Sequence, residues 1–392
     1  MSSGGKLVAE GARRSPYFTE EHEALRDQVR RFVETEIKPH AQQWEEDGFV
    51  PRAVLRKMGE LGFFGIRYPG DYGGSEMDTM ATVVLAEELG RSTFSGVAIT
   101  ALVHTDMASV HIANAGNQAQ KDKYLPGIIA GEKIVAVAVT EPDAGSDVKG
   151  IRTTARREGD HYVLNGAKMF ITNGVHADLY CVAAKTDPQG KPSQSVSIFV
   201  VEKGTPGFSV SRALDKHGWR SSDTAELSFV DCKVPAENLL GQEGRGFYAI
   251  MSNFQNERTV IGAMAMGEAQ AAIDLTLDYV KTRKAFGAPL WEKQAIRQRL
   301  AELAGKVEAG RQLVYHAAWL DAQGFDATRE VSMAKAYCGE LVNEVMYDCL
   351  QFHGGMGYMR ESAIERMTRD ARVQAIGGGA TEVMLEEVAK RL

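Results

Sequence analysis

The stretches Val139-Thr-Glu-Pro-Asp-Ala-Gly-Ser-Asp147 and Asn165-Gly-Ala-Lys-Met-Phe-Ile-Thr-Asn-Gly174 are the most informative part of this chain. Each ends a strand-like apolar run with hydroxyls, amides and a glycine. Gly145 lets the backbone approach a ligand closely, and Ser146 with the neighbouring N–H groups can donate hydrogen bonds to phosphate oxygens. Either stretch alone could be an ordinary turn. Together they indicate a site for a planar ligand with a phosphate tail.

Both stretches lie in the β-rich middle of the chain. Strand-like runs alternate with polar turns between residues 133 and 235, and no helical pattern separates them. This predicts an antiparallel β domain over residues 133–243 rather than a doubly wound sheet. The motif Gly-x-Gly-x-x-Gly is absent, which argues against a Rossmann nucleotide site.

Helical periodicity dominates both flanks of this β domain. Thr19 is a good N-cap for a first helix, and an N-terminal helical domain is expected over residues 18–132. Residues 1–17 are expected to be a disordered tail. A C-terminal bundle is expected over residues 244–392, so the fold class is α+β with a four-helix bundle. The expected helices cover residues 78–91, 102–115, 117–129, 245–283, 292–322, 327–352 and 360–372.

The composition excludes several classes of function. At 392 residues with 44% hydrophobic and 25% charged residues, the chain is typical of a globular protein of two or three domains. A net charge of −7 argues against nucleic-acid binding. The four cysteines and nine histidines form no metal-ligand spacing, so no metal site is expected. No signal peptide or membrane span is expected, and the location is expected to be cytoplasmic.

A carboxylate continues the apolar stripe of the first long bundle helix. Phe247, Ile250 and Phe254 recur at helical spacing, and the stripe then reaches Glu257 and Arg258. A glutamate in that position would be partly desolvated, which raises its pKa and suits it to proton abstraction. The alternative is a structural ion pair or a carboxylate at the helix edge. Periodicity alone favours that alternative.

Further motifs make the chain resemble the acyl-CoA dehydrogenases from about Phe18 to Leu392. Besides the two opening stretches, the matches are Arg283-Lys-Ala-Phe-Gly287, Gln294, Gln351-Phe-His-Gly-Gly355 and Arg369-Asp-Ala-Arg372. The resemblance implies the same three-part fold, usually in a homotetramer. It also implies that FAD binds between the β domain and the C-terminal helices, with help from a neighbouring subunit.

The resemblance carries site residues over position by position. Taken alone, Arg283 would be a solvated basic residue, the segment 351–355 a helix-ending turn, His353 a packed histidine and Tyr248 a surface aromatic. The positions matching FAD contacts are Val137, Ala138, Val139, Thr140, Gly145, Ser146, Phe170, Ile171, Thr172, Arg283, Phe286, Gln294, Gln351, Gly354, Gly355, Ala380 and Glu382. Those matching substrate contacts are Ser146, Tyr248, Gln255, Arg258, Gly378 and Gly379.

One departure from the family pattern decides the base. Many members carry it as Glu in a Tyr-Glu-Gly-Thr segment, where this chain has Gly378. The long-chain and isovaleryl branches instead place it in a Glu-Arg pair that matches Glu257 and Arg258. Glu382 is no substitute, because it matches a flavin-contacting position. Further departures are Gly377 for an aromatic residue, Ala380 for Thr, and Val137 where relatives have aromatic residues.

The implied reaction is the oxidation of an acyl-CoA thioester to a trans-2-enoyl-CoA. Glu257 would remove the α-proton, the flavin would accept the β-hydride, and the Gly378 N–H would hold the carbonyl oxygen in an oxyanion-hole arrangement. Electrons would pass to electron-transferring flavoprotein. Two alternatives stay open: a flavin oxidase or monooxygenase on the same fold, and an inactive scaffold that partners an active paralogue.

Overall fold

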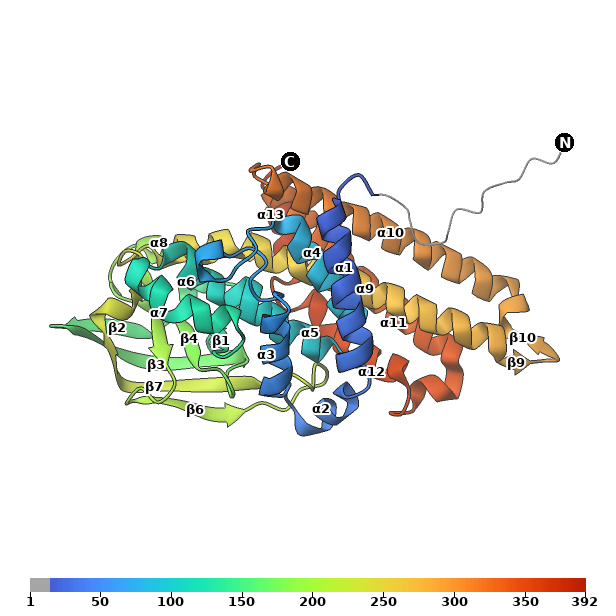
Figure 1. The fold of residues 1–392 in the computed structure, drawn as a ribbon, viewed down its shortest axis with the longest axis horizontal. Helices are drawn as coiled ribbons and strands as arrows, with labels where there is room; N and C mark the ends of the chain where they lie inside the picture. Colours follow the sequence, from blue (N-terminus) through green and yellow to red (C-terminus); the bar gives the residue numbers. More distant parts are fainter. Residues whose placement is uncertain (1–14) are drawn as a thin grey trace.

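The computed structural model describes residues 15–392, so most of the tail expected over residues 1–17 lies outside the described residues. The chain folds into a β domain flanked by an N-terminal group of helices and by three long C-terminal helices that run away from the sheet (Figure 1). The expected α+β architecture is confirmed.

The N-terminal helices pack around one helix that is buried at every residue. This helix, α4 (Thr79–Gly90), has no polar face and forms the centre of the group. Thr19 caps the first helix as expected, because its side chain accepts a hydrogen bond from the His22 N–H. The other helices are α1 (Glu20–Phe32), η1 (Val33–Ile37), α2 (Ala41–Asp47), α3 (Arg52–Glu60), η2 (Gly70–Tyr72), α5 (Ser95–Leu102), η3 (Val103–Ala108), α6 (Ser109–Ala115) and α7 (Gln118–Ile129).

The helix expected over residues 102–115 begins earlier and is not a regular α-helix. Helical structure runs from Ser95 to Ala115, and its middle, η3, is a π-helical segment. The apolar residues before 102 are all buried, so no amphipathic pattern marks the true start. Short π-helical segments inside α-helices are rare and frequently accompany functional sites.

The sheet is mostly antiparallel, with the order β6-β7-β3-β2-β4-β5-β8 and with β1 beside β4. The expected antiparallel domain is departed from at two pairings, because β1 and β2 both run parallel to β4. The chain between these parallel partners contains other strands and loops but no long helix, which is why periodicity did not reveal the parallel pairings. The strands are β1 (Val135–Ala138), β2 (Thr154–Glu158), β3 (His161–Thr172), β4 (Leu179–Lys185), β5 (Val196–Glu202), β6 (Phe208–Ala213), β7 (Thr224–Pro235) and β8 (Leu239–Leu240), with the short helical elements η4 (Val148–Gly150), α8 (Pro192–Ser195) and η5 (Ala236–Asn238).

The C-terminal bundle is built on α9 (Gly246–Thr282), whose middle packs directly on α4. Glycines allow this close approach: a Cβ on Gly267 would lie 2.0 Å from the Glu87 carbonyl oxygen, and one on Gly90 2.3 Å from that of Met264. The expected long helices are present. They are α10 (Gln294–Ala322), α11 (Thr328–His353), α12 (Ala363–Ala371) and α13 (Thr381–Ala389), joined by β9 (Lys284–Ala285), β10 (Ala288–Pro289), η6 (Leu290–Glu292), η7 (Gly354–Tyr358) and η8 (Arg372–Ala375).

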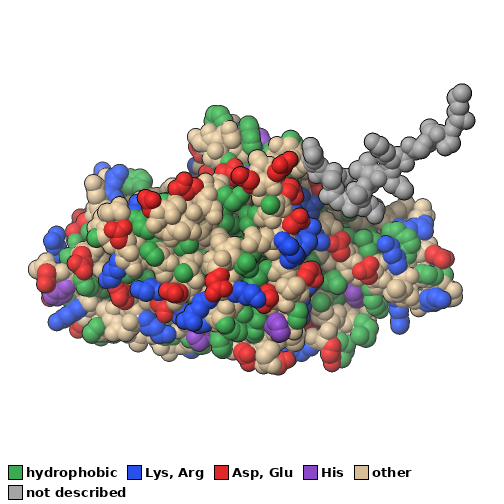
Figure 2. Space-filling model, viewed as in Figure 1, with side chains coloured by type: hydrophobic (Ala, Val, Ile, Leu, Met, Phe, Trp, Pro, Cys, Tyr) green, Lys and Arg blue, Asp and Glu red, His purple; other side chains and the backbone are tan. Residues whose placement is uncertain are grey.

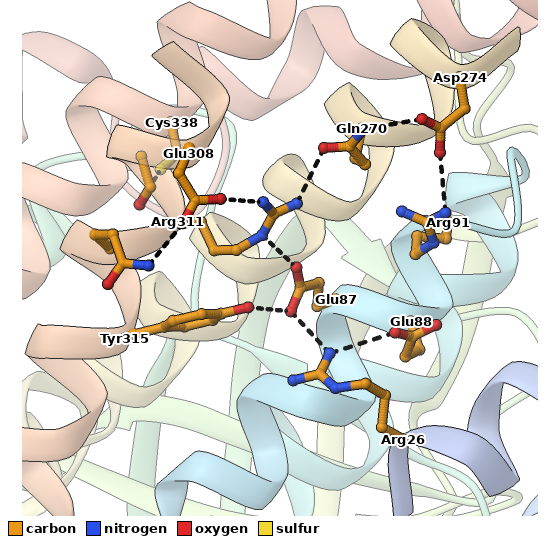
Figure 3. Close-up of polar contacts among 12 residues, drawn as sticks. Arg26, Glu87, Glu88, Arg91, Gln270, Asp274, Glu308, Arg311, Tyr315 and Cys338 are labelled. Carbon is orange, nitrogen blue, oxygen red and sulfur yellow. Dashed lines mark hydrogen bonds and ion pairs between the residues drawn. The ribbon is translucent and has the colours of Figure 1, made fainter. Parts of the chain in front are cut away.

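A buried ionic network ties α1 and α10 to α4 (Figure 3). Glu87 accepts hydrogen bonds from Arg311 Nε at 2.7 Å, from the Tyr315 hydroxyl at 2.6 Å and from Arg26 at 3.1 Å. Burial alone would raise the pKa of Glu87, but the charges of Arg311 and Arg26 outweigh it and lower that pKa. Glu88 completes the network by accepting from Arg26 and Arg30. The buried carboxylates of Glu87 and Glu88 are therefore both paired with arginine side chains, as buried charges must be.

Two helical stretches are long and apolar enough to cross a membrane by length and composition alone, Ser95–Ala115 and Gly246–Thr282. Inside the protein, 89% and 78% of their most apolar windows are buried. Both are core helices of this fold, since their apolar surface already faces protein. On the face that Figure 2 shows, acidic and basic side chains are interspersed, so that face presents no extended field of one sign.

Candidate active site

Glu257 lies in the first half of α9, facing the π-helical segment η3. One turn earlier on α9, the Asn253 Nδ2 donates to Glu257 Oε1 at 3.0 Å and to the Met107 carbonyl oxygen at 3.0 Å. Burial raises the pKa of Glu257 to about 8, although the Asn253 amide and the Arg258 charge oppose this shift. Glu257 is thus a carboxylate held in one orientation, with a basicity suited to proton abstraction.

A glycine loop, residues 375–380, lies against α9 at Arg258 and Ile261, next to Glu257. Gly378 and Gly379 have φ angles of 63° and 105°, and a Cβ on Gly378 would lie 2.3 Å from Ile261 Cδ1, one turn after Glu257. Among residues 15–392, no acceptor receives the N–H of either glycine. The structure therefore brings the Gly378 N–H, which is predicted to hold the thioester oxygen, to the helix that carries the predicted base, with the Gly379 N–H beside it.

Two other predicted substrate residues on α9 have buried polar atoms without protein partners. These atoms are Gln255 Oε1 and Arg258 Nε, in the part of the chain that the structure describes. Arg258 is almost fully buried, and its guanidinium lies 5.4 Å from the centre of the Phe254 ring. Tyr248 is exposed at the start of α9 beneath Arg245, as a surface aromatic would be. Buried unpaired polar groups are costly, so a polar ligand beside α9 would satisfy them.

The two stretches singled out in the sequence are bound to each other. Lys168, which is fully buried, donates to Glu141 Oε1 at 2.7 Å and to the Val139 carbonyl oxygen at 2.9 Å. The Met169 N–H donates to the Thr140 carbonyl oxygen at 2.9 Å. Sequence reasoning missed this buried ion pair, although one charge stands in each stretch. The pair fixes the end of β1 against β3.

The end of β1 and the adjacent part of β3 present groups that suit FAD. A bulge in β3 turns Phe170 outward, with a positive φ of 61° and a ring that is 64% exposed. The Gly145 and Ser146 N–H groups and the Thr140 and Thr172 hydroxyls have no acceptor or partner within residues 15–392. Together they offer an aromatic platform, donors for ring edges and donors for phosphate oxygens. The side chains of Ala138 and Ile171 are buried, so only their backbone faces this edge.

A second group of predicted FAD residues lies at the far end of α9. Arg283, Phe286 and Gln294 surround the β9–β10 hairpin, and the Phe286 side chain is 96% exposed. The segment 351–355 ends α11 nearby, where His353 stacks on Tyr279 with ring centres 4.3 Å apart and is thus a packed residue. The exposed members of this segment are Gln351, Gly354 and Gly355.

One chain does not bring the two groups together. Lys149, close to Ser146, lies 5.8 Å from the ring centre of Phe247 at the start of α9, whereas Arg283 directly follows its last residue. At ~1.5 Å per residue, α9 separates these ends by about 50 Å. That is far longer than an extended FAD molecule. In Figure 1 the β9–β10 hairpin lies at the end of the bundle farthest from the sheet.

Ala380 and Glu382 lie at the N-terminal end of α13. They line a cavity of about 620 Å³ together with Glu340 and Tyr347 of α11 and Ile376 of the glycine loop. Within residues 15–392, no cluster of three or more His, Cys, Asp or Glu side chains could hold a metal ion. The four cysteines are buried as free thiols, and burial raises their pKa values to about 11 or 12.

Family models and known proteins match this chain along its whole length. Models described as the N-terminal, middle and C-terminal domains of acyl-CoA dehydrogenase match residues 19–132, 136–232 and 244–392. The long-chain specific acyl-CoA dehydrogenase of Mus musculus mitochondria is 40% identical over 100% of this chain and 90% of its own length.

Solved structures agree with these matches. A crystal structure of acyl-CoA dehydrogenase from Geobacillus kaustophilus is 44% identical, with a TM-score of 0.92 over 96% of this chain and 99% of that one. A chain from a structure of the electron transferring flavoprotein of Acidaminococcus fermentans is 38% identical, with a TM-score of 0.93 over 95% and 98%. An FAD complex of PigA is 28% identical, with a TM-score of 0.92 over 95% and 98%.

Proposed function

The chain belongs to the acyl-CoA dehydrogenase family, and on this premise we propose that it oxidises an acyl-CoA thioester to the trans-2-enoyl-CoA with Glu257 as the base. It is an FAD-dependent enzyme, and bound FAD supplies the acceptor for the β-hydride at flavin N5. The observation that carries the proposal is the meeting of a partly buried carboxylate, Glu257, with the free N–H groups of the glycine loop on one face of α9.

Glu257 removes the α-proton of the thioester. Its pKa of about 8 makes it a stronger base than an exposed glutamate, and Asn253 holds the accepting carboxylate in place. As the proton leaves, negative charge develops on the thioester oxygen. The Gly378 N–H, which has no acceptor among the described residues, donates to that oxygen. The carbon–carbon double bond forms as the β-hydride departs.

The residues at the edge of β1 and β3 hold one half of FAD. The Phe170 ring would lie against the flavin, Thr140 and Thr172 would donate to its edge, and the Gly145 and Ser146 N–H groups would bind the pyrophosphate. Arg283, Phe286, Gln294 and the 351–355 segment hold the adenosine half of an FAD bound mainly by another subunit. The length of α9 supports this division between two subunits, and the family resemblance makes a homotetramer part of the proposal.

Electron-transferring flavoprotein is the proposed electron acceptor. The likeness to a chain from an electron transferring flavoprotein structure supports this assignment. The proposed substrate is an acyl-CoA, for which Gln255, Arg258 and Gly379 offer contacts beside the base. A cytoplasmic location stays a prediction.

Flavin bleaching tests the assignment of the base. The purified protein should be yellow, and an acyl-CoA substrate should bleach it anaerobically. Glu257→Gln should retain FAD and bind acyl-CoA but lose bleaching by about 10³-fold or more, because no other carboxylate faces the glycine loop from this turn of α9. Bleaching at the wild-type rate in this variant would refute the role of Glu257. Rapid oxygen consumption with peroxide release, in the absence of a partner protein, would instead favour an oxidase.

A further inference from the structure

Lys335 places a buried ammonium group next to the glycine loop. It projects from α11 and is 1% exposed. Its Nζ donates to the Gln374 carbonyl oxygen at 2.7 Å and to the Gly379 carbonyl oxygen. No ion pair involves it among residues 15–392, and burial lowers its pKa to about 8. A buried cation that is satisfied by backbone carbonyls alone is unusual, since buried lysines are normally paired with a carboxylate.

The two carbonyl oxygens stand on either side of Gly378. Gln374 belongs to η8, which leads into the glycine loop, whereas Gly379 follows Gly378 directly. A cation beside the end of a helix commonly stabilises that helix, and the Gln374 contact alone would be such a case. The Gly379 contact lies outside η8, so helix stabilisation does not account for it.

The first of these anchor points is itself rigid. Gly339, one turn after Lys335 on α11, lets the helix backbone abut the Gln374 carbonyl oxygen, which a Cβ would approach to 2.7 Å. The Gln374 side chain is fully buried and donates to Glu268 Oε2 on α9 at 2.6 Å. Lys335 therefore connects Gly379 to a point that two long helices already hold.

The glycine loop needs such an anchor. Three consecutive glycines have a large conformational freedom, and two of them adopt positive φ angles. The Ile376 and Gly377 N–H groups donate to the Val373 carbonyl oxygen, but those of Gly378 and Gly379 find no acceptor among the described residues. The loop past Gly377 is therefore restrained through its carbonyl side, and Lys335 provides that restraint.

Given the proposed role of the Gly378 N–H, on which this step rests, we infer that Lys335 is a positioning residue that holds the glycine loop in the geometry needed to bind the thioester oxygen. Lys335 does not touch the reacting atoms itself. Removing an oxyanion donor outright costs about 10²–10³-fold in rate, so loosening one should cost about 10–100-fold.

The test isolates proton removal from hydride transfer. 3,3-Dimethylbutyryl-CoA has two α-hydrogens but no β-hydrogen, so Glu257 can take an α-proton and return a deuteron from D₂O without any oxidation. The rate of deuterium incorporation by the FAD-loaded enzyme is measured by mass spectrometry, and the Kd of the probe by calorimetry. Amide exchange of a peptide that covers residues 375–381 reports loop mobility independently of any reaction.

Lys335→Met is expected to slow deuterium incorporation by about 10–100-fold, to leave the Kd within about threefold, and to speed amide exchange in the loop. Lys216→Met is the matched control: Lys216 is another largely buried lysine whose Nζ donates to a backbone carbonyl, that of Ser222, but it makes no hydrogen bond to residues 374–380. The control should retain the wild-type rates of both exchanges.

Unchanged deuterium incorporation and unchanged amide exchange in Lys335→Met would overturn the inference. If that variant does not fold, Lys335→Gln, which keeps one short donor, replaces it and should show a smaller loss of rate. Probe binding without deuterium incorporation in the wild-type enzyme would refute the proposed function itself. The amide exchange of the loop would then still decide whether Lys335 restrains it.

Discussion

Replacing Asn253 with leucine should raise the pKa of Glu257 and move the activity of the enzyme to higher pH. The Asn253 amide donates to the Glu257 carboxylate at 3.0 Å and so stabilises its charged form. A hydrogen bond to a charged group contributes about 1.5–3 kcal/mol, and one pKa unit corresponds to about 1.4 kcal/mol. Loss of this bond should therefore raise the pKa from about 8 by about one to two units.

The assay is the anaerobic rate of flavin bleaching by an acyl-CoA between pH 6 and 10. Only ionised Glu257 accepts the α-proton, so the rate rises with pH through the pKa of Glu257. In Asn253→Leu this rise should shift upward by the same one to two units, and the rate at pH 7 should fall about 10–100-fold.

A neighbouring asparagine provides the control for Asn253→Leu. Asn256 also lies on α9 and donates to a carbonyl oxygen of η3, that of Asp106 at 2.6 Å, but it has no hydrogen bond to Glu257. Asn256→Leu should leave the pH of the rise unchanged. A pH profile that does not move in Asn253→Leu, or that moves to lower pH, would refute the reasoning.

Three further variants test other parts of the structure. Burial raises the pKa of Glu257 from about 4.5 to about 8, so the contribution of the protonated Glu257 to folding stability is complete below about pH 4.5 and is lost as pH rises through 8. Glu257→Gln keeps a neutral side chain at every pH. This variant should therefore raise the thermal midpoint at pH 9 but not at pH 4. Glu87→Leu leaves Arg311 without its buried carboxylate partner and Arg26 with only that of Glu88, and should lower the free energy of unfolding in urea by up to about 3–5 kcal/mol at pH 7. Because the pKa of Glu87 is lowered, the difference from wild type should shrink as pH falls through that pKa. Gly378→Ala should slow bleaching, since its Cβ would lie 2.3 Å from Ile261 Cδ1, and adding Ile261→Val, which removes that atom, should restore part of the rate.

Much of the fold could be predicted from the sequence because local signals agree with it. Thr19 caps α1 through its own side chain, and the long periodic segments after Gly244 are helices. The π-helical segment η3 could not be predicted, since every residue before it is buried and periodicity disappears when all faces are apolar. The parallel pairing of β1 with β4 was missed because it depends on tertiary contacts.

In the candidate site, too, some residues could be predicted from the sequence and others could not. The apolar stripe places Glu257 on a core-facing side of α9, and the structure does desolvate its carboxylate, but the choice of Glu257 as the base comes from the family resemblance and not from periodicity. Lys335 could not be predicted, because its partners are the backbone carbonyl oxygens of Gln374 and Gly379, and the contact of Asn253 with η3 could not, because its acceptor is the Met107 carbonyl oxygen. Every residue has a backbone carbonyl group, so the sequence does not indicate which carbonyl oxygen accepts a given hydrogen bond. Positioning residues of this kind become visible only when the backbone is traced.

In the π-helical segment η3, the number of residues matters as much as their identity, because it sets the direction of the carbonyl oxygen that holds Asn253. A π-helical turn amounts to one residue inserted into an α-helix, and each residue of an α-helix turns the chain by about 100°. Deleting a single residue from 103–108 would thus preserve the apolar composition and the helix, yet rotate the Met107 carbonyl away from Asn253. Substitutions that keep residue type can be absorbed here by repacking. The deletion of one residue cannot be absorbed in this way, because it would turn the Met107 carbonyl oxygen, which holds Asn253 beside Glu257, to another side of the helix.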